Sequence, residues 1–185
     1  MADRVFKMHY DDEPLIRERA KPVADPASPE MERLLREMVQ YLKDSQIDSW
    51  AKKNHVRAGV GLAAPQIGDG RRFAAIYVDL GEKGLVQYGL INPVITKTSV
   101  KLCCLSNGEG CLSVAEDKDG YVPRYYRVTV QAYDVLQGKN VTINQTGYPA
   151  IILQHEIDHL DGHLYYDHID KADPWHEIPG IVKIK

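Results

Sequence analysis

The sequence has few cysteines, no excess of charge of either sign and no long apolar run. Three cysteines stand in 185 residues. Because the number is odd and Cys103 and Cys104 are adjacent, a framework of disulfides is not expected. The net charge is −3, from 23 basic and 26 acidic residues, so the basic surface typical of proteins that bind nucleic acid or coat an anionic membrane is not expected. No segment approaches the roughly 20 apolar residues that cross a bilayer.

The overall composition is typical of a globular protein. Hydrophobic residues make up 44% of the chain and charged residues 26%, which excludes wholesale disorder. At about 150 residues per domain, the length predicts one domain over residues 1–185. The start of the chain is acidic and has no apolar block, unlike a signal or transit peptide. We therefore expect a single-domain protein of the cytoplasm.

Two helices are expected. Ser28 and Pro29 are typical of the N-cap and the first position of a helix, and the apolar residues that follow them recur every three or four positions. The sequence therefore predicts an amphipathic helix near the N-terminus, from about Pro29 to Ser45. A second helix is expected to begin near Pro149 and to stop at Gly162.

Between these helices the sequence is rich in Val, Ile, Tyr and Thr, which favour strands. Strands are predicted over Phe73–Asp79, Leu85–Thr98, Tyr126–Val135 and Val141–Asn144. Pro93 is expected to interrupt its strand or to lie at the edge of that strand, since it cannot donate a backbone hydrogen bond. Strands clustered between helices, rather than alternating with them, predict an α+β fold of mostly antiparallel sheets around a central second helix.

The strongest chemical signal is the stretch QHEIDH at residues 154–159. Residues four apart lie on one face of a helix, so His155 and His159 can direct their imidazoles at one metal ion. Glu156 is rotated from His155 by about 100° and can move the proton of a water without binding the metal itself. The flanking residues are mostly apolar, so this helix is expected to be buried, where two histidines and a carboxylate need partners.

The third metal ligand is not supplied by this helix. In a metzincin-like protease a third histidine follows, but Tyr165 stands at its position and His163 is two residues early. Asp158 is expected to point elsewhere. The third ligand must then come from a distant segment, and the stretch EGCLS at residues 109–113 offers Cys111 as the candidate.

Three stretches together resemble one known family. They read GVGLAAPQ at residues 59–66, EGCLS at 109–113 and QHEIDHLDG at 154–162, in the order and at the spacing of the peptide deformylases. INP at 91–93 and VPR at 122–124 are similar to further stretches of that family. The long segment between the first two motifs, and the stretch 117–120, resemble its longer-chain, Gram-positive-like subclass.

The resemblance implies a metal site and a reaction. Cys111, His155 and His159 would hold one divalent ion and leave a fourth position open to water, as a catalytic site requires. A thiolate with two imidazoles suits iron(II), nickel or zinc, and the family implies Fe2+. Activated water would attack the formyl carbonyl of an N-terminal formylmethionine and release formate. Glu156 would act as the general base for the water and then as the general acid for the leaving amine.

The resemblance also assigns supporting roles around the metal. The Gln66 side-chain amide and the Leu112 backbone N–H would stabilise the developing oxyanion. Gly59 and Gly61 would let the backbone run close to the bound peptide. Glu109 and Arg124 would form a pair that holds the EGCLS strand and so orients the ligands. All of these roles are carried over from the family to the matching positions of this sequence.

The side chain of the formylmethionine needs an apolar pocket beside the metal. Ile151 and Ile152, about one turn before the first histidine ligand, are expected to contribute to it, with Val60 opposite and Gly61 beside the substrate. The remaining histidines and cysteines are expected to have no metal role. These are His9, His55, His163, His168 and His176, together with Cys103 and Cys104, which are expected at a buried strand edge.

The expected partners are formylmethionyl nascent peptides, with a transient association with the ribosome and no specific nucleic acid or membrane. Two alternatives stay open. A zinc peptidase with the same helix would need an open cleft and would leave Cys111 and Gln66 unexplained. A non-catalytic structural metal-binding module would need four protein ligands, where the sequence offers three.

Overall fold

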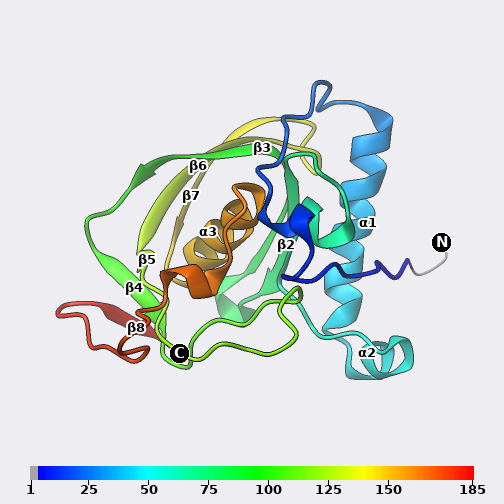
Figure 1. The fold of residues 1–185 in the computed structure, drawn as a ribbon. Coiled ribbons are helices and arrows are strands. Elements are labelled where there is room, and N and C mark those ends of the chain that lie inside the picture. Colours follow the sequence, from blue (N-terminus) through cyan, green and yellow to red (C-terminus); the bar gives the residue numbers. More distant parts are fainter. Residues whose placement is uncertain (1–3) are drawn as a thin grey trace.

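The computed structural model describes residues 4–185 as two β-sheets, three α-helices and four short 3₁₀ helices (Figure 1). The helices are α1 (Pro29–Ser45), α2 (Asp48–Asn54) and α3 (Tyr148–Leu160). The 3₁₀ helices are η1 (Pro14–Arg17), η2 (Ala64–Ile67), η3 (Gly81–Lys83) and η4 (Tyr165–His168). This is the α+β architecture expected from the clustering of strands between helices.

The larger sheet has five strands in the order β1-β2-β3-β6-β7, with every neighbouring pair antiparallel. Its strands are β1 (Gly61–Ala63), β2 (Phe73–Asp79), β3 (Leu85–Thr98), β6 (Arg127–Asp134) and β7 (Lys139–Thr146). The smaller sheet has the order β5-β4-β8, built from β5 (Arg124–Tyr125), β4 (Leu102–Leu105) and β8 (Val182–Ile184). In it, β4 is antiparallel to β5 and parallel to β8.

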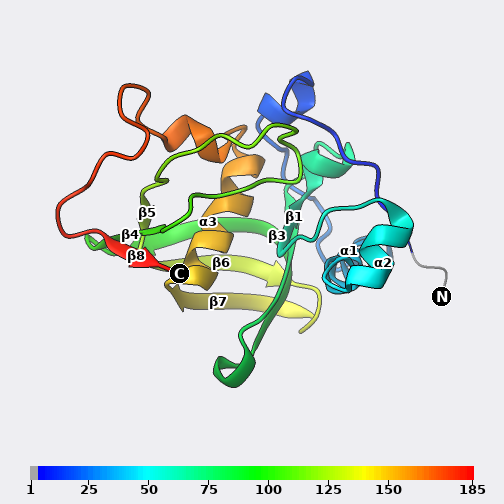
Figure 2. The ribbon, with the colours of Figure 1, turned by 90° about the horizontal axis from the view of Figure 1, so that it is seen from below.

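Strand β2 shows why the two long helices lie on opposite faces of the larger sheet (Figures 1 and 2). Successive side chains of a strand point to opposite faces. Phe73 and Ala75 belong to the buried cluster around α1, whereas Ile76 and Val78 belong to the buried cluster around α3. Because β2 is covered on both faces, its sequence is an almost continuous apolar run.

The apolar sequence of α3 is explained by its position between the two sheets. Its buried face includes Ile152, Leu153 and Ile157, which pack with residues of β2, β3, β6 and β7. The helix is followed by Gly162, whose φ is +79° and whose missing Cβ would lie 2.4 Å from the Arg17 carbonyl oxygen. A side chain at Gly162 is therefore excluded both by conformation and by space, and the chain must turn where the sequence predicts.

The expectation for Pro93 is wrong: Pro93 does not interrupt its strand, and it lies inside β3, a central strand of the sheet, rather than at an edge. Strand β3 runs through it, but the register with β6 shifts between Ile91 and Val94, which is a β-bulge that absorbs the missing N–H. Asn92 within the bulge has a φ of +53°. Its side-chain amide donates to the Val23 carbonyl at 2.9 Å and its Oδ1 accepts from the Val23 N–H at 2.8 Å.

Cys103 and Cys104 are buried and free, as expected, but the expectation of a strand edge is wrong. Both lie on β4, the central strand of the smaller sheet. Cys103 pairs with Arg124 on one side and with Val182 on the other. The neighbouring strand β8 comes from the C-terminal tail, in which no periodic pattern is present, so the local sequence does not indicate this pairing.

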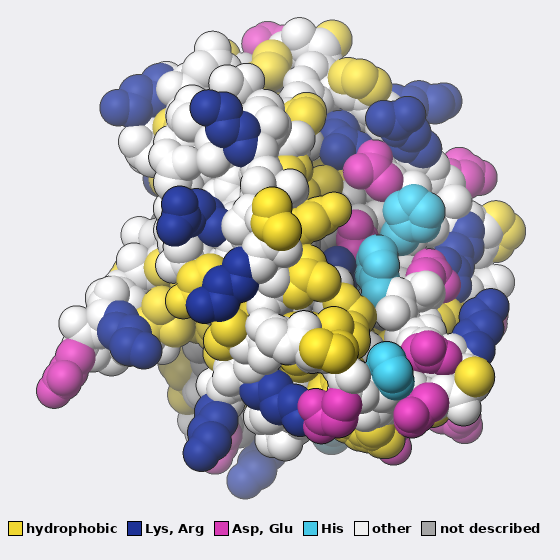
Figure 3. Space-filling view, turned by 90° about the vertical axis from the view of Figure 1, so that its left-hand side faces the viewer, with side chains coloured by type: hydrophobic (Ala, Val, Ile, Leu, Met, Phe, Trp, Pro, Cys, Tyr) yellow, Lys and Arg dark blue, Asp and Glu magenta, His cyan; other side chains and the backbone are white. Residues whose placement is uncertain are grey.

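Among residues 4–185, no helix is long and apolar enough to cross a membrane. On the face shown in Figure 3, basic and acidic side chains are interspersed around apolar and histidine side chains, so no field of one sign covers it. The single domain expected over residues 1–185 stays a prediction, and residues 1–3 of that range lie outside the described part.

The Asn92 bridge predicts a graded loss of stability. Asn92→Ala should lower the free energy of unfolding by about 3 kcal/mol, because two hydrogen bonds worth about 1 kcal/mol each are lost and Ala at positive φ costs about 1 kcal/mol more. Asn92→Gly loses only the hydrogen bonds and should cost about 1 kcal/mol less than Asn92→Ala. Urea unfolding measures both; equal stability of Asn92→Ala and the wild type would contradict this account.

Candidate metal centre and active site

Helix α3 brings His155 and His159 to one face, as the four-residue spacing predicts. Their ring centroids are 5.0 Å apart. Cys111 reaches the same point from the loop after β4, and its Sγ lies 3.2 Å from His159 Nε2. The candidate ligand atoms of the three residues all lie within 4.8 Å of one another, and Cys111 and His159 are buried. In the described part of the chain, these three residues are the one group of this kind.

Glu109 sets the orientation of His155. The Glu109 carboxylate accepts a hydrogen bond from His155 Nδ1 at 2.8 Å, and a carboxylate can only accept. The proton of the imidazole is therefore on Nδ1, and Nε2 keeps its lone pair for a metal ion. Although burial alone would raise it, the hydrogen bonds from His155 and Arg124 lower the pKa of Glu109 to about 2, so the carboxylate stays charged.

Arg124 completes this arrangement. Its Nε and Nη2 donate to the two Glu109 oxygens at 2.9 and 3.0 Å, and both side chains are 3% exposed. The guanidinium also donates to the Asp158 carboxylate, which accepts a second bond from His168 Nε2 at 2.8 Å. Asp158 is thus turned away from the candidate metal ligands, as expected, and Glu109 and Arg124 form the pair that the family resemblance implies.

The two candidate histidine ligands differ in the surroundings that set their pKa. Burial lowers the pKa of His159 well below its usual value, so its imidazole is neutral, the form that binds metals. Burial opposes protonation of His155 as well, but hydrogen bonds to Cys111 and Glu109 raise its pKa. A metal ion bound among these donors would displace the proton that His155 takes up at Nε2 and leave the proton at Nδ1. One soft sulfur and two imidazole nitrogens fit a divalent transition metal.

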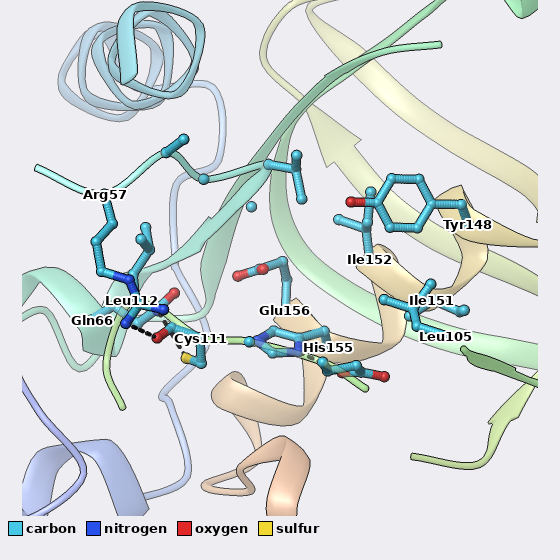
Figure 4. A pocket seen from close by; sticks show the side chains of 16 residues that line it. Arg57, Gln66, Leu105, Cys111, Leu112, Tyr148, Ile151, Ile152, His155 and Glu156 are labelled. Atoms are coloured by element: carbon cyan, nitrogen blue, oxygen red, sulfur yellow. Dashed lines mark hydrogen bonds and ion pairs between the residues drawn. The ribbon is translucent and has the colours of Figure 1, made fainter. Parts of the chain in front are cut away.

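Glu156 and Gln66 lie beside these ligands (Figure 4). Glu156 is 4% exposed, and burial raises the pKa of its carboxyl to about 7. Its Oε2 has no hydrogen-bond partner among the described residues. Gln66 is on η2, where its Oε1 accepts from the Ala63 N–H at 2.8 Å. That bond turns Gln66 Nε2 toward Cys111 Sγ, 3.6 Å away.

A cavity of about 250 Å³ opens at these side chains (Figure 4). Leu112 lines it next to Cys111, and the apolar residues expected from the sequence all line it as well: Val60, Gly61, Ile151 and Ile152. The structure therefore brings together every residue that the sequence assigns to metal, catalysis and substrate.

Tyr148, Leu105 and Arg57 are among the lining residues that were not expected from the sequence. Tyr148 and Leu105 extend the apolar end of the cavity. Tyr148 stands one turn before Ile152, so helical spacing could have indicated it. Arg57 donates to the carbonyl oxygens of Cys111 and Val114 at 3.2 and 3.0 Å. No sequence signal marks Arg57, because its partners follow it by more than fifty residues.

The buried pair predicts a large effect of Arg124. Arg124→Met should lower the free energy of unfolding by about 3–5 kcal/mol, because it leaves Glu109 charged, buried and short of donors. It should also weaken metal binding about 10–100-fold through His155. Urea unfolding and metal titration measure these effects. The exposed pair of Arg33 with Glu37 provides the control, since Arg33→Ala should cost less than about 1 kcal/mol. Equal effects of the two substitutions would contradict this role of Arg124.

Comparisons with known proteins agree with this geometry. Residues 5–175 match the family described as polypeptide deformylase. The chain is 48% identical to the peptide deformylase of Pediococcus pentosaceus over 165 residues, covering 89% of each chain. It is 44% identical to peptide deformylase 2 of Bacillus subtilis over 175 residues, covering 95% of each. These organisms agree with the Gram-positive-like subclass that the sequence resembles.

Solved structures lead to the same family. The peptide deformylase of Thermotoga maritima superposes with a TM-score of 0.71 and 31% identity, covering 90% of this chain and 99% of that one. The peptide deformylase of Thermus thermophilus superposes with a TM-score of 0.72 and 32% identity, covering 91% of this chain and 87% of that one. The chain belongs to the peptide deformylase family.

Proposed function

We propose that this chain is a metal-dependent hydrolase that removes the N-formyl group from formylmethionine at the start of newly made polypeptides and releases formate. The observation that carries the proposal is a group of three side chains that could hold a metal ion, two of which, Cys111 and His155, line one cavity together with a buried carboxylate and a side-chain amide. Membership of the peptide deformylase family supports the same reaction.

Cys111, His155 and His159 would hold the ion, which we propose to be Fe2+, with Ni2+ or Zn2+ able to occupy the site. When bound, a divalent ion supplies Lewis acidity that lowers the pKa of water and polarises a carbonyl. Glu109 and Arg124 would support these ligands by keeping the His155 lone pair directed at the site.

The proton transfers fall to Glu156. A general base works best when its pKa is near the operating pH, and burial raises the pKa of Glu156 to about 7. Its carboxylate would take a proton from water at one oxygen and return it to the leaving amine nitrogen. Gln66 Nε2 and the Leu112 N–H would donate to the carbonyl oxygen as negative charge develops on it.

The apolar end of the cavity would hold the methionine side chain. Val60, Ile151, Ile152 and Tyr148 line it, and an unbranched thioether packs well against branched aliphatic walls. We propose formylated nascent peptides as the partner, met in the cytoplasm during a transient association with the ribosome.

The two alternatives are disfavoured by the same site. A structural metal module closes its ion with four protein ligands, and the residues 4–185 bring three together here. A zinc peptidase would give no role to Gln66, whose amide is aimed at Cys111 by the bond to Ala63. Formate release from a formyl-Met peptide, compared with cleavage of the unformylated peptide, tests the proposal: deformylation alone is expected, and cleavage of internal bonds would overturn it.

The metal ligands predict a contrast between cysteines. Cys111→Ala should remove bound metal, because a site with three protein ligands does not tolerate the loss of one. Cys104→Ala should keep it, because Cys104 is buried on β4 and belongs to no group of metal-binding side chains among the described residues. Elemental analysis of the two purified variants measures this, and full metal content in Cys111→Ala would remove Cys111 from the site.

The assignment of Glu156 predicts a variant that binds metal and does not turn over. Glu156→Gln should keep the metal and the fold but lose about 10²–10⁴-fold in kcat, because the amide cannot accept the proton. Gln66→Leu should also keep the metal and lose about 10²–10³-fold in kcat. Steady-state formate release on metal-replete protein is the measurement. A near-normal kcat in Glu156→Gln would exclude Glu156 as the base.

A further inference from the structure

Gly61 is in direct contact with the Glu156 carboxylate. A Cβ built on Gly61 would lie 2.0 Å from Glu156 Oε1, 2.5 Å from Cδ and 2.8 Å from Cγ. Such contacts do not occur between real atoms, so the space that any other residue would need at position 61 is filled by Glu156. A side chain at position 61 would therefore displace the Glu156 carboxylate, whether or not substrate is bound.

Little else holds this carboxylate in place. Glu156 Oε2 has no hydrogen-bond partner among the described residues, whereas the neighbouring carboxylates of Glu109 and Asp158 are each held by an arginine and a histidine. With no such bonds at Oε2, the position of the Glu156 side chain depends on packing.

The wall against which Glu156 packs is rigid. Gly61 pairs with Ile76 in the antiparallel ladder of β1 and β2, and the Val60 carbonyl accepts from the Tyr77 N–H at 2.9 Å. Helix α3, which carries Glu156, packs against β1. The carboxylate is therefore confined between a hydrogen-bonded strand and its own helix.

We propose that Gly61 is a positioning residue for Glu156, whose carboxylate occupies the slot left by the absent side chain and is held there for proton transfer. This inference rests on the proposed function, since it concerns the same carboxylate. It differs from the role carried over from the family for the GVG stretch, in which the glycines admit the substrate backbone. Gly59 contrasts with Gly61, because a Cβ there would come within 3.0 Å only of the end of one side chain, Leu112 Cδ1 at 2.8 Å, and not of its inner carbons.

A double-mutant cycle on formate release separates the two roles. Gly61→Ala should lower kcat by up to about 10²–10⁴-fold, the contribution of the general base, with KM and metal content unchanged. In the Glu156→Ala background there is no carboxylate to displace. There, Gly61→Ala should change the residual kcat/KM by less than about twofold. A rise in KM, or a further loss in that background, would show that Gly61 serves substrate approach and would overturn the proposal.

Gly70→Ala is the matched control, because a Cβ there meets only Leu15 Cδ1 at an ordinary 3.7 Å; its activity should equal that of the wild type. If Gly61→Ala does not fold, the Gly61→Ala/Glu156→Ala double variant should, because the colliding atoms are gone. Failure of the double variant to fold would overturn the proposal.

Urea unfolding keeps this test distinct from that of the proposed function. If the wild-type protein releases no formate, the proposed function fails. The contact then predicts that Gly61→Ala destabilises the wild type and not the Glu156→Ala variant. Equal destabilisation in both backgrounds would show that Glu156 does not fill the slot.

Discussion

The site depends on one buried carboxylate. Taking the charge of Glu109 out of water costs several kcal/mol, and this cost is offset by the bidentate guanidinium of Arg124 and by the imidazole of His155. These partners come from the loop before Cys111, from strand β5 and from helix α3. One ion-pair network therefore fixes the relative positions of the two segments that supply the candidate metal ligands, links both to β5, and selects the tautomer of His155.

The fold places this network at the wall of a cavity that is apolar at one end. Helix α3 packs on the larger sheet, and β1 forms the edge of that sheet beside the helix. The same apolar surroundings that pack α3 deprive Glu156 of solvent and bring its pKa to about 7. A carboxylate in water would titrate far lower, so the packing of the helix and the chemistry proposed for its glutamate have one cause.

The sequence predicts the local structure of single elements, but it does not predict contacts between segments that are distant in the chain. The bounds of α1 follow from its capping residues and apolar periodicity, and those of β2 and β3 from runs rich in Val, Ile, Tyr and Thr. The spacing of His155 and His159 on α3 predicts their shared direction. The placement of Cys103 on a central strand depends on Val182 from the tail, and the contacts of Arg57 depend on a loop more than fifty residues away. Such pairings leave no periodic signal in either partner. The filling of the Gly61 slot by Glu156 is likewise a property of packing and is absent from the motif.

The central claim is that one sulfur and two imidazole nitrogens hold an ion whose remaining position is open. X-ray absorption at the metal edge of zinc-loaded protein measures this directly. The account predicts one sulfur at about 2.3 Å, two nitrogens at about 2.0–2.1 Å and one light atom that does not come from the protein, with the sulfur lost in Cys111→Ala. A shell without sulfur in the wild-type protein, or one closed by four protein ligands, would contradict it.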